Sequence, residues 1–263
     1  MIRKVLIALA TMLLPATAQA QQFRDKDPIT IDPTKAYILY HYSFDMALTF
    51  IRTPTDEDLA NYQNMRSTAL AAAKARHVRD LKAYETWYLA WKRAKSRGDA
   101  SATEPEKPVE PTDDNFDFPP IERSQLVQTK EGRRALKEAG VRWYLIGVPP
   151  GEYSLYGFVT MFGGGYVGQC MCMGTVKFEA KPGVVTYIGE QILPNLKLPD
   201  PNVVLPAKFA KLPVRPAEFR AGGKFANFFG LMITRISEYP GILRYERDRI
   251  IDVRAEGGSP STN

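Results

Sequence analysis

The chain has 263 residues, of which 44% are hydrophobic and 24% are charged, and its formal net charge is +6. This length is sufficient for one hydrophobic core with an appendage, or for two small domains. The charge excess is too small to indicate a nucleic-acid-binding protein. Two cysteines cannot form a disulfide-dense scaffold, so apolar burial must hold the fold together.

Residues 1–20 have the pattern of a secretory signal peptide. Two basic residues precede the apolar run Val5–Leu14, and Ala18-Gln19-Ala20 provides the small-x-small pattern of a cleavage site. This run is too short to span a bilayer, and no later run reaches the roughly 18 apolar residues that a transmembrane segment needs. We therefore expect a mature chain that begins near Gln21, after cleavage near Ala20, in a bacterial periplasm or outside the cell.

The next elements are two strands and a long helix. Ile29–Ile31 and Ala36–Leu48 are rich in β-branched and aromatic residues, which favours strands. After a break at Thr53-Pro54-Thr55, the range Asp56–Arg97 contains neither Pro nor Gly and is dominated by helix-forming residues. Thr55 can cap this helix, and its acidic first turn and basic last turn follow the helix dipole. We predict one long helix that projects, or a helical hairpin.

Apolar residues of this helix recur along one stripe at the 3.6-residue period. The C-terminal end of the stripe is aromatic and contains Tyr84, Trp87, Tyr88 and Trp91. The stripe either packs on the body of the protein or binds a partner, such as another protein of the cell envelope. The segment Gly98–Pro120 is rich in Pro, Asp and Glu, and we predict a loop or a disordered linker that is poorly suited to cover these rings.

Beyond the linker, the pattern predicts one short helix and then mainly strands. The helix is Thr129–Ala139, capped by Thr129 and ended by Gly140. The Pro-rich segment 194–216 should follow the surface in an extended form, and Phe225–Ile236 is compatible with a strand or a helix. The predicted strands, which alternate with Pro and Gly turns, are Val141–Val148, Tyr153–Phe162, Tyr166–Ala180, Val184–Ile188 and Leu243–Val253.

Closely spaced strands with Pro-Gly turns are typical of an antiparallel sandwich or barrel. We therefore predict an α+β fold, in which an antiparallel β-sandwich carries an inserted long helix or helical hairpin. The sandwich would comprise residues 21–53 and 121–263, with the Pro-rich segment 194–216 on it. The insertion, with its acidic and Pro-rich linker, would be residues 54–120.

Two motifs lie in the strand-rich region between residues 141 and 190. They are Pro150-Gly151-x-Tyr153-x-Leu155 and Phe178–Gly189. In these motifs the chain resembles the β-sandwich domain of uncharacterised bacterial periplasmic and envelope proteins, which is related in outline to transthyretin-like and carboxypeptidase-regulatory-like modules. The resemblance implies a sandwich domain of unknown, non-catalytic role, by analogy at the level of the fold alone.

The two cysteines, Cys170 and Cys172, alternate with two methionines. In a strand the cysteines would share one face and the methionines the other, so the four sulfurs could not converge on one metal ion. Our first interpretation is therefore buried small hydrophobes inside a sheet. Two alternatives remain open: a disulfide between Cys170 and Cys172, which is strained at this spacing in a strand, and a Cu(I) site, which requires a loop.

The sequence contains no motif of a known catalytic centre. His41 lies in a predicted strand and His77 on the helical stripe, one turn from Asp80, and structural roles account for both histidines. We expect no catalytic residue, metal or cofactor. The main hypothesis is a non-enzymatic periplasmic interaction or binding module. The alternatives are an unidentified periplasmic enzyme such as a hydrolase, and a copper-handling or redox protein that uses Cys170 and Cys172.

Overall fold

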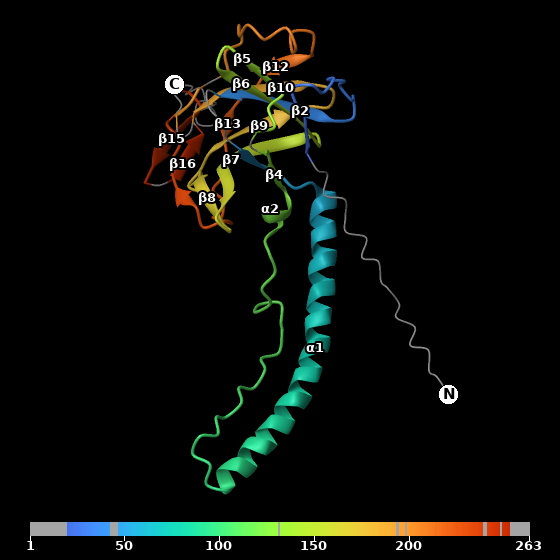
Figure 1. Ribbon diagram of the computed structural model, residues 1–263, viewed down its shortest axis with the longest axis vertical. Helices are drawn as coiled ribbons and strands as arrows, with labels where there is room; N and C mark the ends of the chain where they lie inside the picture. Colours follow the sequence, from blue (N-terminus) through green and yellow to red (C-terminus); the bar gives the residue numbers. More distant parts are fainter. Residues whose placement is uncertain are drawn as a thin grey trace, which may run out of the picture. The chain divides into compact units, whose positions relative to one another are not determined.

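The computed structural model of the chain describes residues 20–42, 47–130, 132–192, 195–197, 199–238, 241–247 and 249–252 (Figure 1). These residues fall into two units, which we call the body and the arm. The arm is Pro54–Ile121, and the body comprises the described residues up to Thr53 and from Glu122 onward. The expected signal peptide, residues 1–20, lies outside the described residues except for Ala20.

Two sheets of mixed orientation make up most of the body. In the first sheet the strand order is β1-β6-β2-β10-β11, with β5 beside β6 and β12 beside β10. β2 runs antiparallel to β6 but parallel to β10, and β10 also runs parallel to β12. The strands are β1 (Gln21–Gln22), β2 (Ala36–Tyr42), β5 (Leu136–Glu138), β6 (Val141–Val148), β10 (Val185–Ile192), β11 (Asn195–Leu196) and β12 (Val214–Pro216).

In the second sheet the order is β13-β9-β7-β3-β4, with β8 beside β7 and β14 beside β8. Its strands are β3 (Leu48–Arg52), β4 (Leu126–Gln128), β7 (Gly151–Phe162), β8 (Gly165–Cys170), β9 (Val176–Ala180), β13 (Arg220–Ala221) and β14 (Met232–Ile233). β14 runs parallel to β8. The sheets and the long helix confirm the α+β class. The expected purely antiparallel arrangement is wrong, because strands joined by long connections can pair in the same direction, which local turn patterns do not reveal.

A buried cluster of aromatic rings joins residues of both sheets. Tyr40 of β2 stacks on Tyr144 of β6 at 5.0 Å between ring centroids, and it meets Phe50 of β3 edge-on at 6.3 Å. Phe50 in turn packs edge-on against Phe178 of β9 at 6.2 Å. Each buried aromatic ring removes a large apolar area from water, and such ring pairs add roughly 0.5–1.5 kcal/mol beyond that burial. This cluster therefore ties the first sheet to the second.

The Pro-rich segment and the aromatic segment after it each cover one side of a sheet. Val203, Leu205 and Phe209 pack with Trp143 in a second cluster on the first sheet. Residues 225–231 pack against β7 and β8 in a third cluster, which also contains both cysteines. Phe225–Ile236 is therefore neither a long strand nor a helix, and only β14 within it pairs with a sheet.

The helix predicted over Thr129–Ala139 is wrong, because the described residues of this range, 129–130 and 132–139, form no helix. Part of that range forms β5, which pairs with β6 through Leu136 and Trp143. The two-residue turn between the strands contains Ala139 (φ 48°) and Gly140 (φ 80°). Positive φ at both positions is what a tight hairpin turn requires. Pairing with β6 therefore outweighs the helix-forming composition of this segment.

Several predicted strands are divided in the structure. Tyr166–Ala180 is interrupted by a turn between β8 and β9, and Leu243–Val253 is a hairpin of β15 (Leu243–Glu246) and β16 (Arg249–Asp252). The predicted strand Ala36–Leu48 corresponds to β2 and the start of β3, with residues 43–46 outside the described part. Ile29–Ile31 has no strand structure. By contrast, Val141–Val148 matches β6 at both ends.

The predicted long helix is confirmed as α1, Asp56–Ser96. Thr55 accepts a hydrogen bond from the Asp58 backbone N–H, and the Asp58 carboxylate accepts one from the Thr55 backbone N–H at 2.8 Å, so the two residues form a capping box. The helix ends before Gly98, whose φ of 86° stops it. No helical hairpin forms: the chain returns in an extended form and enters the short helix α2 (Ile121–Ser124). No helix of the described residues is long and apolar enough to cross a membrane.

The arm is inserted between two paired strands. β3 precedes it and β4 follows it, and they pair antiparallel through Phe50 and Val127. The two ends of the arm are therefore held close together by the second sheet, as the ends of a hairpin loop are.

Candidate functional site

The first candidate surface is the arm, where the extended segment runs back alongside α1 (Figure 1). Both ends of this return segment are fastened to the helix. The Tyr62 hydroxyl donates a hydrogen bond to the Pro119 carbonyl at 3.1 Å, and the Arg66 guanidinium contacts the Asp113 carboxylate at 2.7 Å. At the far end, the Lys95 ammonium donates to the Ala100 carbonyl at 3.2 Å.

The middle of the return segment shows a three-residue burial period. Ala102, Pro105, Pro108 and Pro111 are half-buried, and the residues between them are exposed. A polyproline II helix has three residues per turn and no internal hydrogen bonds. The burial period matches this repeat, with the Ala/Pro edge as the more covered edge of the segment. Gly98–Pro120 is a loop without helix or strand, which is one of the two predicted alternatives, and it is tied to α1 through Arg66 and Tyr62.

The return segment changes the interpretation of the four aromatic residues proposed as a binding surface. Tyr84 and Tyr88 stack at 5.6 Å between ring centroids, Tyr88 packs on Trp91 at 5.3 Å, and all three are half-buried. The Lys92 ammonium lies over the Tyr88 ring at 4.7 Å. Trp87 is different, because 64% of its surface is exposed. Three of the four rings thus form a partly covered stack, and Trp87 alone of the four faces solvent.

The cysteine segment lies in the third cluster of the body. β8 ends at Cys170, and the chain turns before β9 begins at Val176. This turn brings the Cα atoms of Cys170 and Cys172 to 5.2 Å, within the range of disulfides, and the two residues form a disulfide. Both side chains are buried. The prediction of one continuous strand is wrong here, and bridged sulfurs have no thiolate to offer a metal ion.

His41 is held among aromatic rings on the first sheet. Its imidazole lies 4.5 Å from the Trp143 ring and stacks on Tyr187 at 6.0 Å, and its Nδ1 is 3.2 Å from the Tyr187 hydroxyl. Burial lowers the pKa of His41 below its usual 6.5, and the charge of Glu190 opposes this shift only partly. Burial, together with Asp200 and Glu190, raises the pKa of Tyr187 to about 12. The arrangement favours a neutral imidazole that accepts or donates one structural hydrogen bond.

The surroundings of His77 do not indicate a catalytic or metal-binding role. It is half-buried on the helical stripe of the arm, and Asp80, one turn away, is exposed. Within the described part of the chain, no three His, Cys, Asp or Glu residues are grouped so that they could hold a metal ion.

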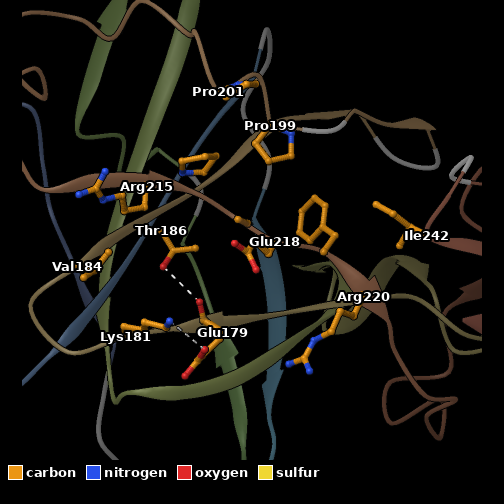
Figure 2. Close-up of a pocket in the computed structure, with 13 residues that line it drawn as sticks. Glu179, Lys181, Val184, Thr186, Pro199, Pro201, Arg215, Glu218, Arg220 and Ile242 are labelled. Carbon is orange, nitrogen blue, oxygen red and sulfur yellow. Dashed lines mark hydrogen bonds and ion pairs between the residues drawn. The ribbon is translucent and has the colours of Figure 1, made fainter. Parts of the chain in front are cut away.

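A cleft of about 800 Å³ lies where the chain crosses from β12 in the first sheet to β13 in the second (Figure 2). Its charges are mixed. The Lys181 ammonium is 3.5 Å from the Glu179 carboxylate, and Arg220 is engaged by Glu152 at 2.6 Å. Thr186 donates to the Glu179 carbonyl at 3.5 Å, and Phe219 and Ile242 supply buried apolar surface. The cleft combines ion pairs with proline rings and presents no paired nucleophile and base.

Sequence reasoning did not find this cleft. Its lining comes from β9, β10, the Pro-rich segment and the crossover after β12, which are brought together only by the pairing of distant strands. Pro199, Pro201 and Pro216 were visible in the sequence as part of an extended segment, but nothing in their spacing indicates a cleft. Comparison of the chain with protein-family models, curated proteins and solved structures found no match.

Proposed function

We propose that the protein is an exported, non-enzymatic interaction module. In this proposal a β-sandwich body carries an arm that binds another protein of the cell envelope. The sequence pattern of residues 1–20 supports export, and the aromatic cluster shared by both sheets supports a sandwich. The resemblance of two sequence motifs to transthyretin-like and carboxypeptidase-regulatory-like modules is in keeping with a binding role, by analogy of fold only.

The exposed ring of Trp87 is the observation that carries the proposal. Trp is among the residues most enriched at interface hot spots. Here it is displayed on a helix that the return segment contacts on both sides of it in sequence, through Arg66 and through Lys95. A partner would therefore meet a side chain whose backbone is already ordered, which lowers the entropic cost of binding.

The alternative hypotheses receive less support from the same residues. Copper handling would need thiolates, whereas Cys170 and Cys172 are joined in a disulfide. A hydrolase would need a base beside a nucleophile, whereas the His41 imidazole packs against the Trp143 ring and hydrogen-bonds with the Tyr187 hydroxyl. These arrangements favour structural roles for the sulfurs and for the imidazole.

A photo-crosslinking residue placed at position 87 tests the binding surface. Val78 is the matched control position, because it is also exposed and lies nine residues away, on the opposite side of the helix. We expect one discrete adduct in the cell envelope from position 87 and none from position 78. Equal labelling from both positions, or no adduct from position 87, would overturn the proposal.

Substitution of two tryptophans separates binding from stability. Trp87→Ala should abolish co-purification of the crosslinked partner with this protein. The melting temperature of the arm should remain within error of the wild-type value. Trp91→Ala removes a half-buried ring and should lower that melting temperature. If Trp87→Ala destabilises the arm as much as Trp91→Ala does, Trp87 is a packing residue and not a binding residue.

Export is tested separately by the mass of the chain recovered from the periplasm. A mature chain that starts at Gln21, or within a residue or two of it, would support cleavage after Ala20. In the structure β1 begins at Gln21 and pairs with β6. An intact Met1 on the periplasmic chain would overturn the cleavage proposal.

A further inference from the structure

Two segments of the body carry no charged residue, and they meet at one place. The first lies between Glu152 and Lys177 and the second between Lys224 and Arg235. They come together because β14 pairs with β8. In a chain that is 24% charged, this end of the second sheet is set apart by its composition.

The β7–β8 hairpin is drawn in yellow-green to yellow in Figure 1. Its tip exposes large apolar side chains. Phe162 is 75% exposed and Met161 68% exposed. The neighbouring strand β14 pairs with Gln169 and Cys170, at the end of β8 away from the tip, and adds exposed apolar side chains there. The exposed apolar residues of this region are Met161, Phe162, Tyr166, Val167, Met232 and Ile233.

The apolar side chains occupy both faces of the hairpin. Met161 and Tyr166 are directly opposite each other in the β7–β8 register and therefore share one face, where Phe229 packs on Tyr166 at 4.7 Å. Phe162 and Val167, the next residues along their strands, point to the other face. A rigid protein surface would cover one face of such a ribbon, whereas a fluid medium can surround both faces at once.

Pairing within the hairpin satisfies part of the backbone at its tip. β7 and β8 stay paired up to Phe162 and Gly165, so the strand edges that face each other satisfy their N–H and C=O groups. The turn needs only Gly163 (φ 58°) and Gly164 (φ 83°), where an added side chain would be strained.

We propose that the β7–β8 tip inserts into the interfacial region of a lipid bilayer that contains anionic lipids. Phe162 and Met161 enter the acyl boundary, and Tyr166 lies at the level of the headgroups, where its amphipathic ring is favoured. The excess of positive charge complements anionic headgroups: the formal net charge is +6 for the whole chain, and it is +4 once Arg3 and Lys4 are removed with residues 1–20. This inference goes beyond the proposed function, because it concerns another surface and another kind of partner.

Vesicle flotation with the full mature chain tests the proposal. The probes are vesicles of phosphatidylcholine with phosphatidylglycerol, and vesicles of phosphatidylcholine alone. We expect the wild type to float with the anionic vesicles, and we expect Met161→Asp with Phe162→Asp to reduce the bound fraction at least about tenfold. Val204→Asp is the control: Val204 is an apolar residue of the body outside the hairpin, and it is even more exposed than Phe162. Its substitution should leave flotation unchanged.

A second variant locates the tip in the bilayer. Phe162→Trp should keep binding, and its fluorescence should be quenched by brominated acyl chains more strongly than that of the wild type. Circular dichroism checks that every variant is folded. The proposal is overturned if the wild type does not float, or if the double Asp variant is folded and still floats. Sedimentation that shows a wild-type dimer, lost in the double Asp variant without any vesicle binding, would assign the tip to a protein interface instead.

Discussion

Cys170 and Cys172 show how one turn changes what a pair of side chains can do. Two residues apart in a strand, their Cα atoms would stand near the upper limit for a bridge. The turn after Cys170 shortens this distance to 5.2 Å. The position is also fixed from outside the segment. The backbone N–H of Thr234 donates a hydrogen bond to the Cys170 carbonyl at 2.9 Å, and the backbone N–H of Phe225 donates one to the Cys172 carbonyl at 3.0 Å. The sequence predicts that the residues are buried but cannot predict these distant donors.

We expect the double substitution Cys170→Ala with Cys172→Ala to lower the free energy of unfolding by about 1–3 kcal/mol. Two buried side chains become smaller, while the bridged loop is too short to restrict the unfolded chain strongly. Urea unfolding measures the change. The single substitution Thr234→Ala keeps both sulfurs and serves as the control. A loss of bound copper with unchanged stability would contradict the structural role.

His41 makes the stability of the body depend on pH. Because burial lowers its folded-state pKa below 6.5, the unfolded chain binds the proton more readily than the folded chain does. The stabilising contribution is therefore complete above pH 6.5 and is lost as the pH falls from there through the folded-state pKa. Urea unfolding between pH 7.5 and about pH 5 should show this loss.

His41→Phe tests whether this residue is the cause. It keeps a ring between Trp143 and Tyr187 but cannot bind a proton, so the fall in stability over that interval should become shallower. The NMR titration of the His41 ring in the wild type gives the folded-state pKa directly. A value above 6.5 would refute the assignment.

At the scale of elements, α1 could be predicted and its partner could not. Composition without Pro or Gly, the Thr55 cap and the charged ends define the helix almost to the residue. The return segment has the composition of a disordered linker, and its stability comes from contacts that are long-range in sequence, such as Arg66 with Asp113. The three-residue spacing of Pro105, Pro108 and Pro111 in the sequence is a signal for an extended segment with one covered edge, because three residues make one turn of polyproline II.

Replacing Pro105, Pro108 and Pro111 together by Ser should loosen the return segment from α1. The prolines contribute contact area and a restricted backbone, and both are lost on substitution. We expect faster hydrogen exchange in the C-terminal half of α1 and a lower melting temperature of the arm. The control replaces Glu106, Val109 and Thr112 by Ser: these residues follow the prolines and are exposed, so it should leave both quantities unchanged.

The short elements were harder to predict for a related reason. Thr129–Ala139 has helix-forming composition, yet β6 offers Leu136 a paired position beside Trp143. Likewise the cleft exists only because β12 joins β10 and β13 joins β9. Where an element depends on a partner distant in the chain, local propensity does not decide the outcome.

At the scale of the whole molecule, the two sheets share one set of buried rings. Tyr40, Tyr144, Phe50 and Phe178 come from four different strands, and their β-rich surroundings were recognised in the sequence. The strand order could not be predicted from the sequence, because three strand pairings among the described residues are parallel and connect distant segments. Burial and strand character can thus be predicted from residue types, whereas topology depends on which segments meet.

Removing the arm is the sharpest test of this division into units. We expect a chain in which a short Gly/Ser turn replaces Pro54–Ile121 to fold with β3 and β4 still paired. Shortening the loop lowers its closure cost by up to about 2 kcal/mol, so the body should be no less stable than in the full chain. Urea unfolding followed through Trp143, then the sole tryptophan, measures this. Loss of folding would show that the body depends on the arm.

The position of the arm has a consequence for how such a protein can diversify. β3 and β4 fix only the spacing between Thr53 and Glu122 and leave everything between them unconstrained. Any substitute whose ends lie a hairpin's width apart can be grafted there without altering the sheet. A lineage could therefore exchange, lengthen or shorten the arm while inheriting the body unchanged. For the same reason, a chosen recognition helix could be inserted by design between β3 and β4.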